Sequence, residues 1–135
     1  MSEDRADPGP ESTGPTAAEM TDDVLRDVLL PQDPPVTVQV EKRDLHGVSD
    51  IVVTLSVGEM SVGFAFPPLD DRTELLVAIA DRVQDALVDL LAVGRPACRA
   101  AGHDHPLTPT IDQDTAVWRC PKSAYQVEVT RYSGA

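Results

Sequence analysis

Four side chains near the C-terminus have the types and the spacing of metal ligands. Both cysteines of the chain and two of its three histidines lie in PACRAAGHDHPLTPTIDQDTAVWRCP, residues 96–121. They follow the spacing C-x4-H-x-H-x14-C and are Cys98, His103, His105 and Cys120. Two thiolates and two imidazoles form a common closed, four-coordinate structural zinc site. The pattern therefore indicates structural zinc, with three ligands from one loop and the fourth from a hairpin turn.

Two other interpretations of this segment stay open at the level of sequence. Cys98 and Cys120 could be reduced thiols that pack as small apolar side chains, with His103 and His105 in an ordinary loop. The two cysteines could instead form a reversible disulfide. Metal content is the measurement that separates these interpretations.

The same segment also has a catalytic alternative. If only three of its side chains held zinc, the fourth position could bind a water molecule of lowered pKa, as in hydrolases. No H-E-x-x-H motif supplies a general base beside it. The sequence therefore favours a non-enzymatic protein without catalytic residues, and a metal-dependent hydrolase that uses this loop is the alternative.

The elements that must position these residues begin with a short helix and three strands. Residues 21–30 start at Thr21, a capping residue, carry apolar side chains at helical spacing and end before Pro31. Period-two alternation of apolar and polar residues predicts three strands, at 36–41, 51–57 and 60–66. The polar tract that follows the first strand predicts a long connection.

A tight hairpin is expected between the second and third strands. Gly58 and Glu59 fit a two-residue type II′ turn, which would place Val57 opposite Met60. The alternating apolar side chains should form one buried face: Val36, Val38, Val40, Ile51, Val53, Leu55, Val57, Met60, Val62, Phe64 and Phe66. The reverse face is small and semi-polar, so we expect it to be exposed or lightly covered.

The longest predicted helix covers residues 71–93. Asp71 and Glu74 form a capping-box pattern at its start, and Gly94 and Pro96 end it. Its apolar face should be buried against the sheet: Leu76, Ile79, Val83, Leu87, Leu90 and Leu91, with Ala78, Ala80 and Ala86 beside them.

The opposite face of this helix is acidic. Asp81, Asp85 and Asp89 follow one another at four-residue spacing. Such a stripe is either a solvated helix surface or a docking surface for Lys and Arg side chains of a partner. The three residues are therefore the candidate partner-binding residues.

The chain closes with a predicted hairpin. Strands at 115–120 and 125–132 flank the connection PKSA, and Trp118 should face the core. The fold class is thus α+β, a single domain over 20–135 in which an antiparallel sheet is covered by the long helix, with the first helix at its margin. Residues 96–135 resemble a zinc ribbon, and residues 1–19 predict a disordered acidic tail.

Charge and composition limit the partners. The 135-residue chain has a formal net charge of −12, which repels nucleic-acid phosphates and anionic lipids and attracts a basic protein. The N-terminus has neither the basic nor the apolar region of a secretion signal, so the expected location is the cytoplasm.

Two resemblances add to this interpretation. CRAAGHDHPL followed by AVWRCP resembles the C-terminal tail of small actinobacterial proteins with a Cys, then His-Pro-Leu, then Trp-x-Cys-Pro. The resemblance covers about a quarter of the chain and implies no activity. The element order, size and acidity are similar to class I type III secretion chaperones, which implies a chaperone-like protein that docks a protein partner. We expect such a protein to form a homodimer.

Overall fold

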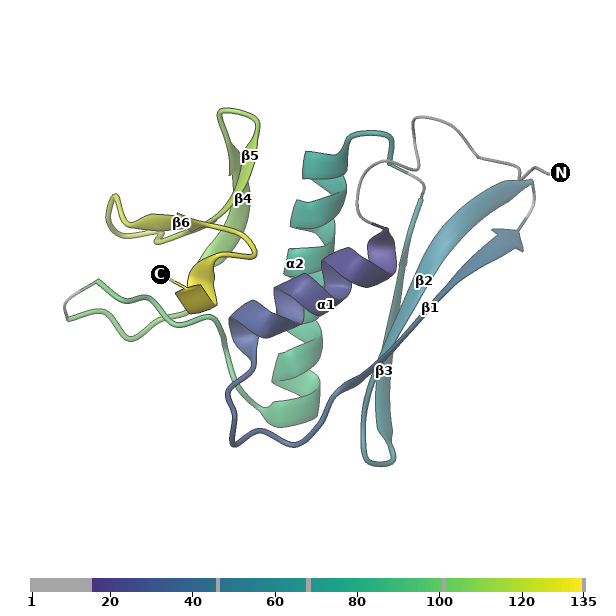
Figure 1. Ribbon diagram of the computed structural model, residues 1–135, viewed down its shortest axis with the longest axis horizontal. Helices are drawn as coiled ribbons and strands as arrows, with labels where there is room; N and C mark the ends of the chain where they lie inside the picture. The colour runs from purple at the N-terminus through teal and green to yellow at the C-terminus, as the bar shows by residue number, and fades with distance from the viewer. Residues whose placement is uncertain (1–15, 46, 68, 101, 135) are drawn as a thin grey trace, which may run out of the picture.

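The computed structural model describes residues 16–134, except positions 46, 68 and 101. Its elements run in the order helix, three strands, helix, three strands and a short 3₁₀ helix (Figure 1). They are α1 (Ala17–Val28), β1 (Thr37–Leu45), β2 (Val48–Val57), β3 (Met60–Phe66), α2 (Arg72–Leu91), β4 (Thr108–Asp112), β5 (Thr115–Arg119), β6 (Gln126–Glu128) and η2 (Tyr132–Gly134). The predicted single-domain α+β class is confirmed.

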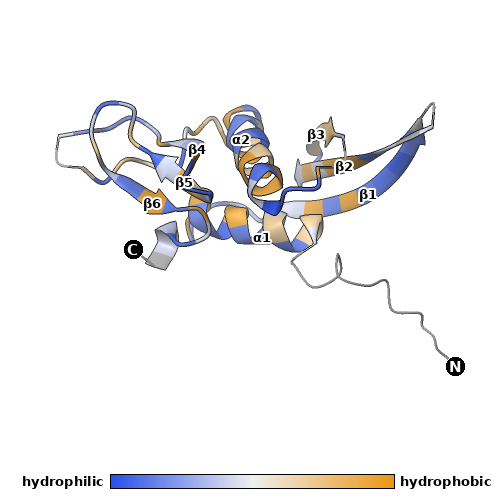
Figure 2. Ribbon diagram, turned by 90° about the horizontal axis from the view of Figure 1, so that it is seen from above, coloured by the Kyte–Doolittle hydropathy of each residue, from blue (hydrophilic) through white to orange (hydrophobic). Residues whose placement is uncertain are grey.

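The strands form two sheets, and α2 lies between them. One sheet has the order β1-β2-β3 and the other β4-β5-β6, and both are antiparallel. Seen from above, the sheets stand on either side of α2, while α1 lies across one side of that helix (Figure 2). The predicted C-terminal hairpin is present as β5 and β6, and β4, a strand that was not predicted, pairs with β5 to make a second sheet of three strands.

The first sheet follows the predicted alternation through most of its length. Val53, Leu55, Phe64 and Phe66 are buried, and the reverse face of β3 is exposed. Gly58 has φ +59°, as a type II′ turn requires, and Val57 pairs with Met60.

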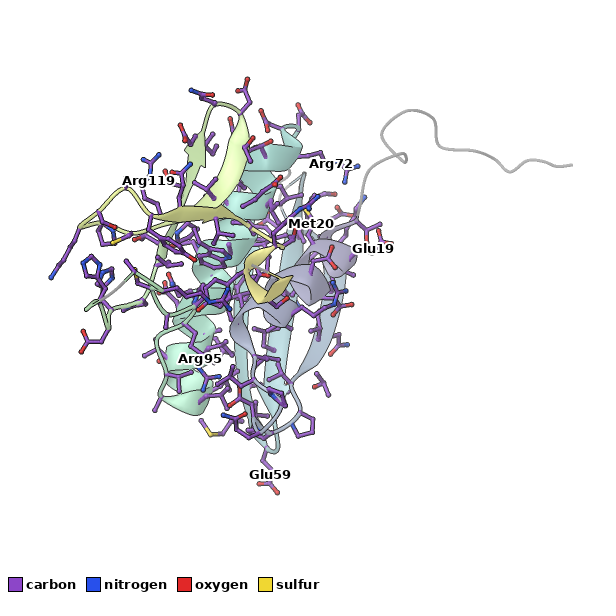
Figure 3. The ribbon with its side chains drawn as sticks, turned by 60° about the vertical axis from the view of Figure 1, so that its left-hand side comes forward. Glu19, Met20, Glu59, Arg72, Arg95 and Arg119 are labelled. Atoms are coloured by element: carbon purple, nitrogen blue, oxygen red, sulfur yellow. The ribbon has the colours of Figure 1, made fainter. Side chains whose placement is uncertain are left out.

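Two predictions on this sheet need correction. Met60 is 53% exposed rather than buried, because it lies at the end of the hairpin, where Glu59 projects from the tip (Figure 3). The polar tract after the first predicted strand is itself paired strand, since β1 continues to Leu45 and β2 begins at Val48. Backbone pairing does not need apolar side chains where both faces of a ribbon meet water.

Helix α2 forms the centre of the core. The Asp71 carboxylate caps its N-terminus by accepting from the Thr73 and Glu74 N–H groups, and Ala92, with φ 57°, ends it. Its buried residues are Leu75, Ile79, Ala80, Val83, Ala86, Leu87 and Leu90. The buried face thus matches the prediction, except that Leu75 is buried while Leu76, Ala78 and Leu91 are only partly so.

Helix α1 begins four residues earlier than predicted. Thr16 and Glu19 form a complete capping box, whereas Thr21 is fully buried and donates its hydroxyl to the Ala17 carbonyl. The helix packs across α2 and contacts β1 and η2, so it is part of the core rather than at the margin of the domain, where it was predicted. Of the predicted tail 1–19, positions 1–15 lie outside the described residues, and 16–19 cap and open this helix.

The second sheet carries the candidate ligands. β4 and β5 are joined by Gln113 and Asp114, both with positive φ, which is the geometry of a type I′ turn. Trp118 is completely buried in β5, as predicted. β6 is shorter than predicted, and the chain after Glu128 turns into η2. Among the described residues, no helix combines the length and apolar content that crossing a membrane requires.

Candidate metal centre

The first three candidate ligands lie on one narrow loop. The Cys98 N–H donates to the His105 carbonyl at 3.0 Å, and the Leu107 N–H donates to the Pro96 carbonyl at 2.8 Å. These bonds pair the two arms of the loop and place Cys98 beside His105. At the tip, the His103 N–H donates to the Ala100 carbonyl at 3.1 Å and turns the chain back toward the site.

The fourth candidate ligand comes from the turn that follows β5. The Cys120 N–H donates to the Tyr125 carbonyl at 2.9 Å, which closes the turn between β5 and β6. Cys120 is 1% exposed and Cys98 6% exposed, and the two imidazoles are half-buried. Both cysteines are free thiols. Two turns that are distant in sequence therefore present their polar side chains to the same point.

The donor atoms of these four side chains all lie within 4.8 Å of one another. His103 Nδ1 lies 3.4 Å from His105 Nε2 and 3.4 Å from Cys120 Sγ. Cys120 Sγ is 3.4 Å from His105 Nε2, and Cys98 Sγ is 3.7 Å from His103 Nδ1.

These separations match the edges of a zinc coordination tetrahedron. Bonds of about 2.3 Å to sulfur and about 2.05 Å to nitrogen give edges of about 3.3 Å between nitrogens and about 3.6 Å between nitrogen and sulfur. A packed pair of thiols needs no such arrangement with imidazoles, so the four side chains form a cluster that could hold a metal ion. The residues fit a tetrahedral metal ion.

Contacts around the ligands also suit metal binding. His105 Nδ1 lies 2.9 Å from the Pro106 carbonyl, so this nitrogen carries the proton and Nε2 is left to bind a metal. The Ala100 N–H donates to Cys98 Sγ at 3.4 Å, and the Lys122 N–H donates to Cys120 Sγ at 3.3 Å. Each sulfur thus accepts a backbone hydrogen bond.

The pKa of Cys120 is lowered to about 6 by its surroundings. Burial acts in the opposite direction and is the largest single influence, but hydrogen bonds to the sulfur outweigh it. These come from Ser123, the Lys122 N–H, His103 and Cys98. The thiolate, which is the form that binds metal, is therefore the favoured form at neutral pH.

A set of polar contacts that the sequence analysis missed fixes this loop to the rest of the protein. The Tyr132 hydroxyl donates to the Ala97 carbonyl at 2.7 Å, and the Arg99 guanidinium stacks on the Tyr132 ring at 3.7 Å. The buried Asp27 carboxylate of α1 accepts from Trp118 Nε1–H at 2.8 Å, Thr130 N–H at 2.6 Å and Tyr132 N–H at 3.1 Å. The candidate centre is thereby connected to α1.

Known proteins give no further guide to the function. No protein-family model, curated protein or solved structure matches the chain.

The predicted partner-binding residues lie outside the metal cluster. Asp81, Asp85 and Asp89 are all exposed along α2. A separate hollow of about 470 Å³ lies where α1, β1, β2 and the start of α2 meet. Its lining mixes apolar side chains with charges of both signs: Ala17, Val40, Ile51, Leu69 and Leu75 with Glu41, Lys42, Asp70 and Arg72. None of the four candidate ligands lines it.

Proposed function

We propose that this protein binds one structural zinc ion through Cys98, His103, His105 and Cys120 and acts as a non-enzymatic, chaperone-like binding protein. The observation that supports the zinc site is the set of four donor-to-donor distances of 3.4 to 3.7 Å, which match four of the six edges of a zinc tetrahedron. Two thiolates and two imidazoles suit zinc better than magnesium or calcium, which prefer oxygen ligands.

The zinc ion would join two turns that are distant in the sequence. One turn holds Cys98, His103 and His105, and the other holds Cys120. A metal bound by four protein side chains supplies folding free energy where a small core is insufficient. Reduced thiols are also the state expected in the cytoplasm, which is the location we propose.

The hydrolase alternative receives less support from this geometry. A catalytic zinc ion keeps an open position for water, whereas the four donors here would fill a tetrahedral shell. Among the described residues, the cluster contains only cysteines and histidines, so it has no carboxylate that could act as a general base. A structural role is the better interpretation.

The binding role is supported by charge and by open surface. The net charge of −12 and the exposed Asp81, Asp85 and Asp89 favour a basic protein partner and disfavour nucleic acid. The reverse face of β3, with Ser61, Gly63 and Ala65 exposed, is also uncovered in the monomer.

Elemental analysis tests the zinc site directly. Protein purified without a histidine tag should contain about one zinc ion per chain. Cys120→Ser and His103→Gln should each lower the zinc content strongly. His46→Gln, which changes the chain's third histidine, is the matched control and should keep the metal. Substoichiometric zinc in the wild type would overturn the proposal.

Cobalt(II) provides a second readout that does not depend on activity. Cobalt bound to thiolates and imidazoles in a tetrahedral site absorbs strongly in the visible region and shows sulfur-to-metal bands in the near ultraviolet. These bands should appear on cobalt titration and disappear when zinc is added. A weak spectrum typical of octahedral oxygen ligands would contradict the assigned ligand set.

A further inference from the structure

The side of α2 that faces away from α1 combines acidic and apolar side chains along one stripe. In Figure 2 this side carries the hydrophilic colour and is open between the two sheets. The exposed residues of α2 are Glu74, Asp81, Arg82, Asp85, Val88 and Asp89, so one basic side chain lies among four acidic ones. Val88, an apolar residue that is 51% exposed, lies among the aspartates.

A hollow with an apolar floor adjoins this stripe. It has a volume of about 350 Å³ and lies between α2, β4 and the connection that leads into α2. Its lining is Leu69, Glu74, Val77, Ala78, Asp81, Pro109 and Ile111. Ile111 is 41% exposed on the edge strand β4. The hollow could therefore receive an apolar side chain that passes between the two carboxylates.

The acidic side chains of the stripe have no cationic partner within the described part of the chain. None of the ion pairs among the described residues includes Asp81, Asp85 or Asp89. Like charges four residues apart destabilise a helix by a few tenths of a kcal/mol per pair. A partner that brings cations to this stripe would remove that repulsion.

We infer that this surface, the α2–β4 face, docks a basic amphipathic segment of another protein. The three aspartates recur at intervals of about 6 Å along the helix axis. Lys or Arg side chains one turn apart on a helical partner have the same spacing, and an apolar residue next to the cation that faces Asp81 would enter the hollow beside Ile111. A second copy of this chain is a poor occupant, because the net charge of −12 opposes self-docking on an acidic face. The inference rests on the proposed binding role.

The test uses the full chain and a synthetic probe. The probe is a capped alanine-based helical peptide with arginine at every fourth position and leucine on the same face, and its reference peptide has glutamate in place of every arginine. Fluorescence anisotropy should show binding of the arginine peptide alone, weaker at high salt. No binding of the arginine peptide, or equal binding of both peptides, would overturn the inference.

Matched variants localise the effect. Asp81→Asn/Asp85→Asn/Asp89→Asn should weaken binding about tenfold, since three partly screened ion pairs are lost. Asp22→Asn/Glu59→Gln/Asp114→Asn removes the same charge at other exposed positions and should change binding less than about twofold. Equal losses in the two triple variants would show that only net charge matters and would refute the proposed face.

The apolar part of the face has its own pair of variants. Ile111→Thr should weaken binding, whereas Leu30→Thr, at a residue of similar exposure, should not. Amide NMR shifts should map the peptide to α2 and β4. A peptide that binds but shifts only residues elsewhere would overturn this face while leaving the binding role intact, so the two failures can be told apart.

Discussion

Asp27 is a charged residue whose side chain is buried in the core. Its carboxylate is 4% exposed and accepts hydrogen bonds from the Trp118 indole and the Thr130 and Tyr132 backbone N–H groups. A buried carboxylate is tolerated only where such donors replace water. The residue thus fixes α1 to the second sheet.

We predict that Asp27→Asn destabilises the fold by roughly 2–4 kcal/mol in urea unfolding. The new amide N–H₂ group would face one of the N–H donors and leave that donor without an acceptor. Trp118→Phe, which removes one donor and keeps an aromatic ring, should cost less. Asp22→Asn, on the exposed side of the same helix, is the control. A stability within about 0.5 kcal/mol of wild type for Asp27→Asn would show that these bonds contribute little.

The four candidate metal ligands could be identified from the sequence, whereas the buried hydrogen bonds of Asp27 could not. Cys98, His103, His105 and Cys120 were recognisable because metal chemistry restricts both residue type and spacing. Asp27 has no such signature in the sequence, since its partners lie 91 to 105 positions further along the chain. Only the tertiary fold reveals such a network.

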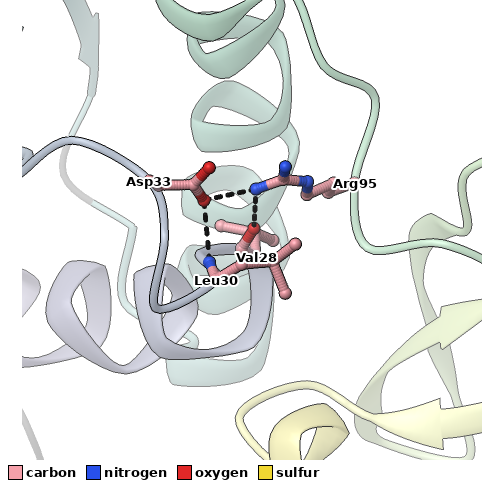
Figure 4. A network of polar contacts seen from close by, with 4 residues as sticks. All are labelled: Val28, Leu30, Asp33 and Arg95. Atoms are coloured by element: carbon pink, nitrogen blue, oxygen red, sulfur yellow. Dashed lines mark hydrogen bonds and ion pairs between the residues drawn. The ribbon is translucent and has the colours of Figure 1, made fainter.

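At the level of elements, an ion pair joins the C-terminal ends of the two helices. Asp33 follows α1 and Arg95 follows α2, and their side chains are in direct contact (Figure 4). The Asp33 carboxylate also accepts from the Leu30 N–H at 2.7 Å, and Arg95 reaches the Val28 carbonyl at 3.4 Å. The pKa of Asp33 is lowered, first by the hydrogen bond from Arg95 and then by that from Leu30, against a smaller opposing effect of burial.

This pKa shift predicts an acid-dependent contribution to stability. Because the folded pKa lies below the unfolded value of about 3.9, the contribution is complete above that value and is lost as the pH falls through the folded pKa. Asp33→Asn should therefore be less stable than wild type at pH 7. The difference should shrink below pH about 4 and vanish in stronger acid. Urea unfolding at several pH values measures it, and a difference independent of pH would contradict the assignment.

The buried face of α2 can be tested with two neighbouring residues. Leu87 is fully buried and Val88 is 51% exposed. Leu87→Ala should cost roughly 2–5 kcal/mol, because it leaves a cavity between α2 and its neighbours. Val88→Ala should change stability by less than about 1 kcal/mol. Thermal unfolding of both variants is the measurement, and similar melting temperatures would refute the assigned face.

Helices and strands with a regular spacing of apolar residues were predictable from the sequence. Strands that are defined mainly by backbone pairing with a neighbour were not. The helix at 71–93 and the strands at 51–57 and 60–66 carried clear apolar patterns. β4 escaped prediction because Pro109 argues against a strand and its turn lacks the usual Asn-Gly or Asp-Gly signal. Pro109 is tolerated there because β4 is an edge strand.

For the whole molecule, the metal proposal predicts a graded response to chelation. Removing zinc should loosen residues 96–132, and the effect should extend to the C-terminal half of α1, because Asp27 receives its hydrogen bonds from that region. β1, β2 and β3 should stay protected, since their hydrogen bonds involve only one another. Hydrogen exchange with and without chelator measures this. Uniform loss of protection in both sheets would show that the fold responds as one cooperative unit.

The long sequence separation of the Asp27 contacts also bears on how the chain is made. During synthesis α1 leaves the ribosome long before Trp118, Thr130 and Tyr132 exist, so its carboxylate has none of its three donors. Burying it at that stage would cost free energy that nothing offsets. Helix α1 should therefore dock only after residues 118–132 have been synthesised and have left the ribosome, which leaves nascent α1 exposed to chaperones and proteases until then.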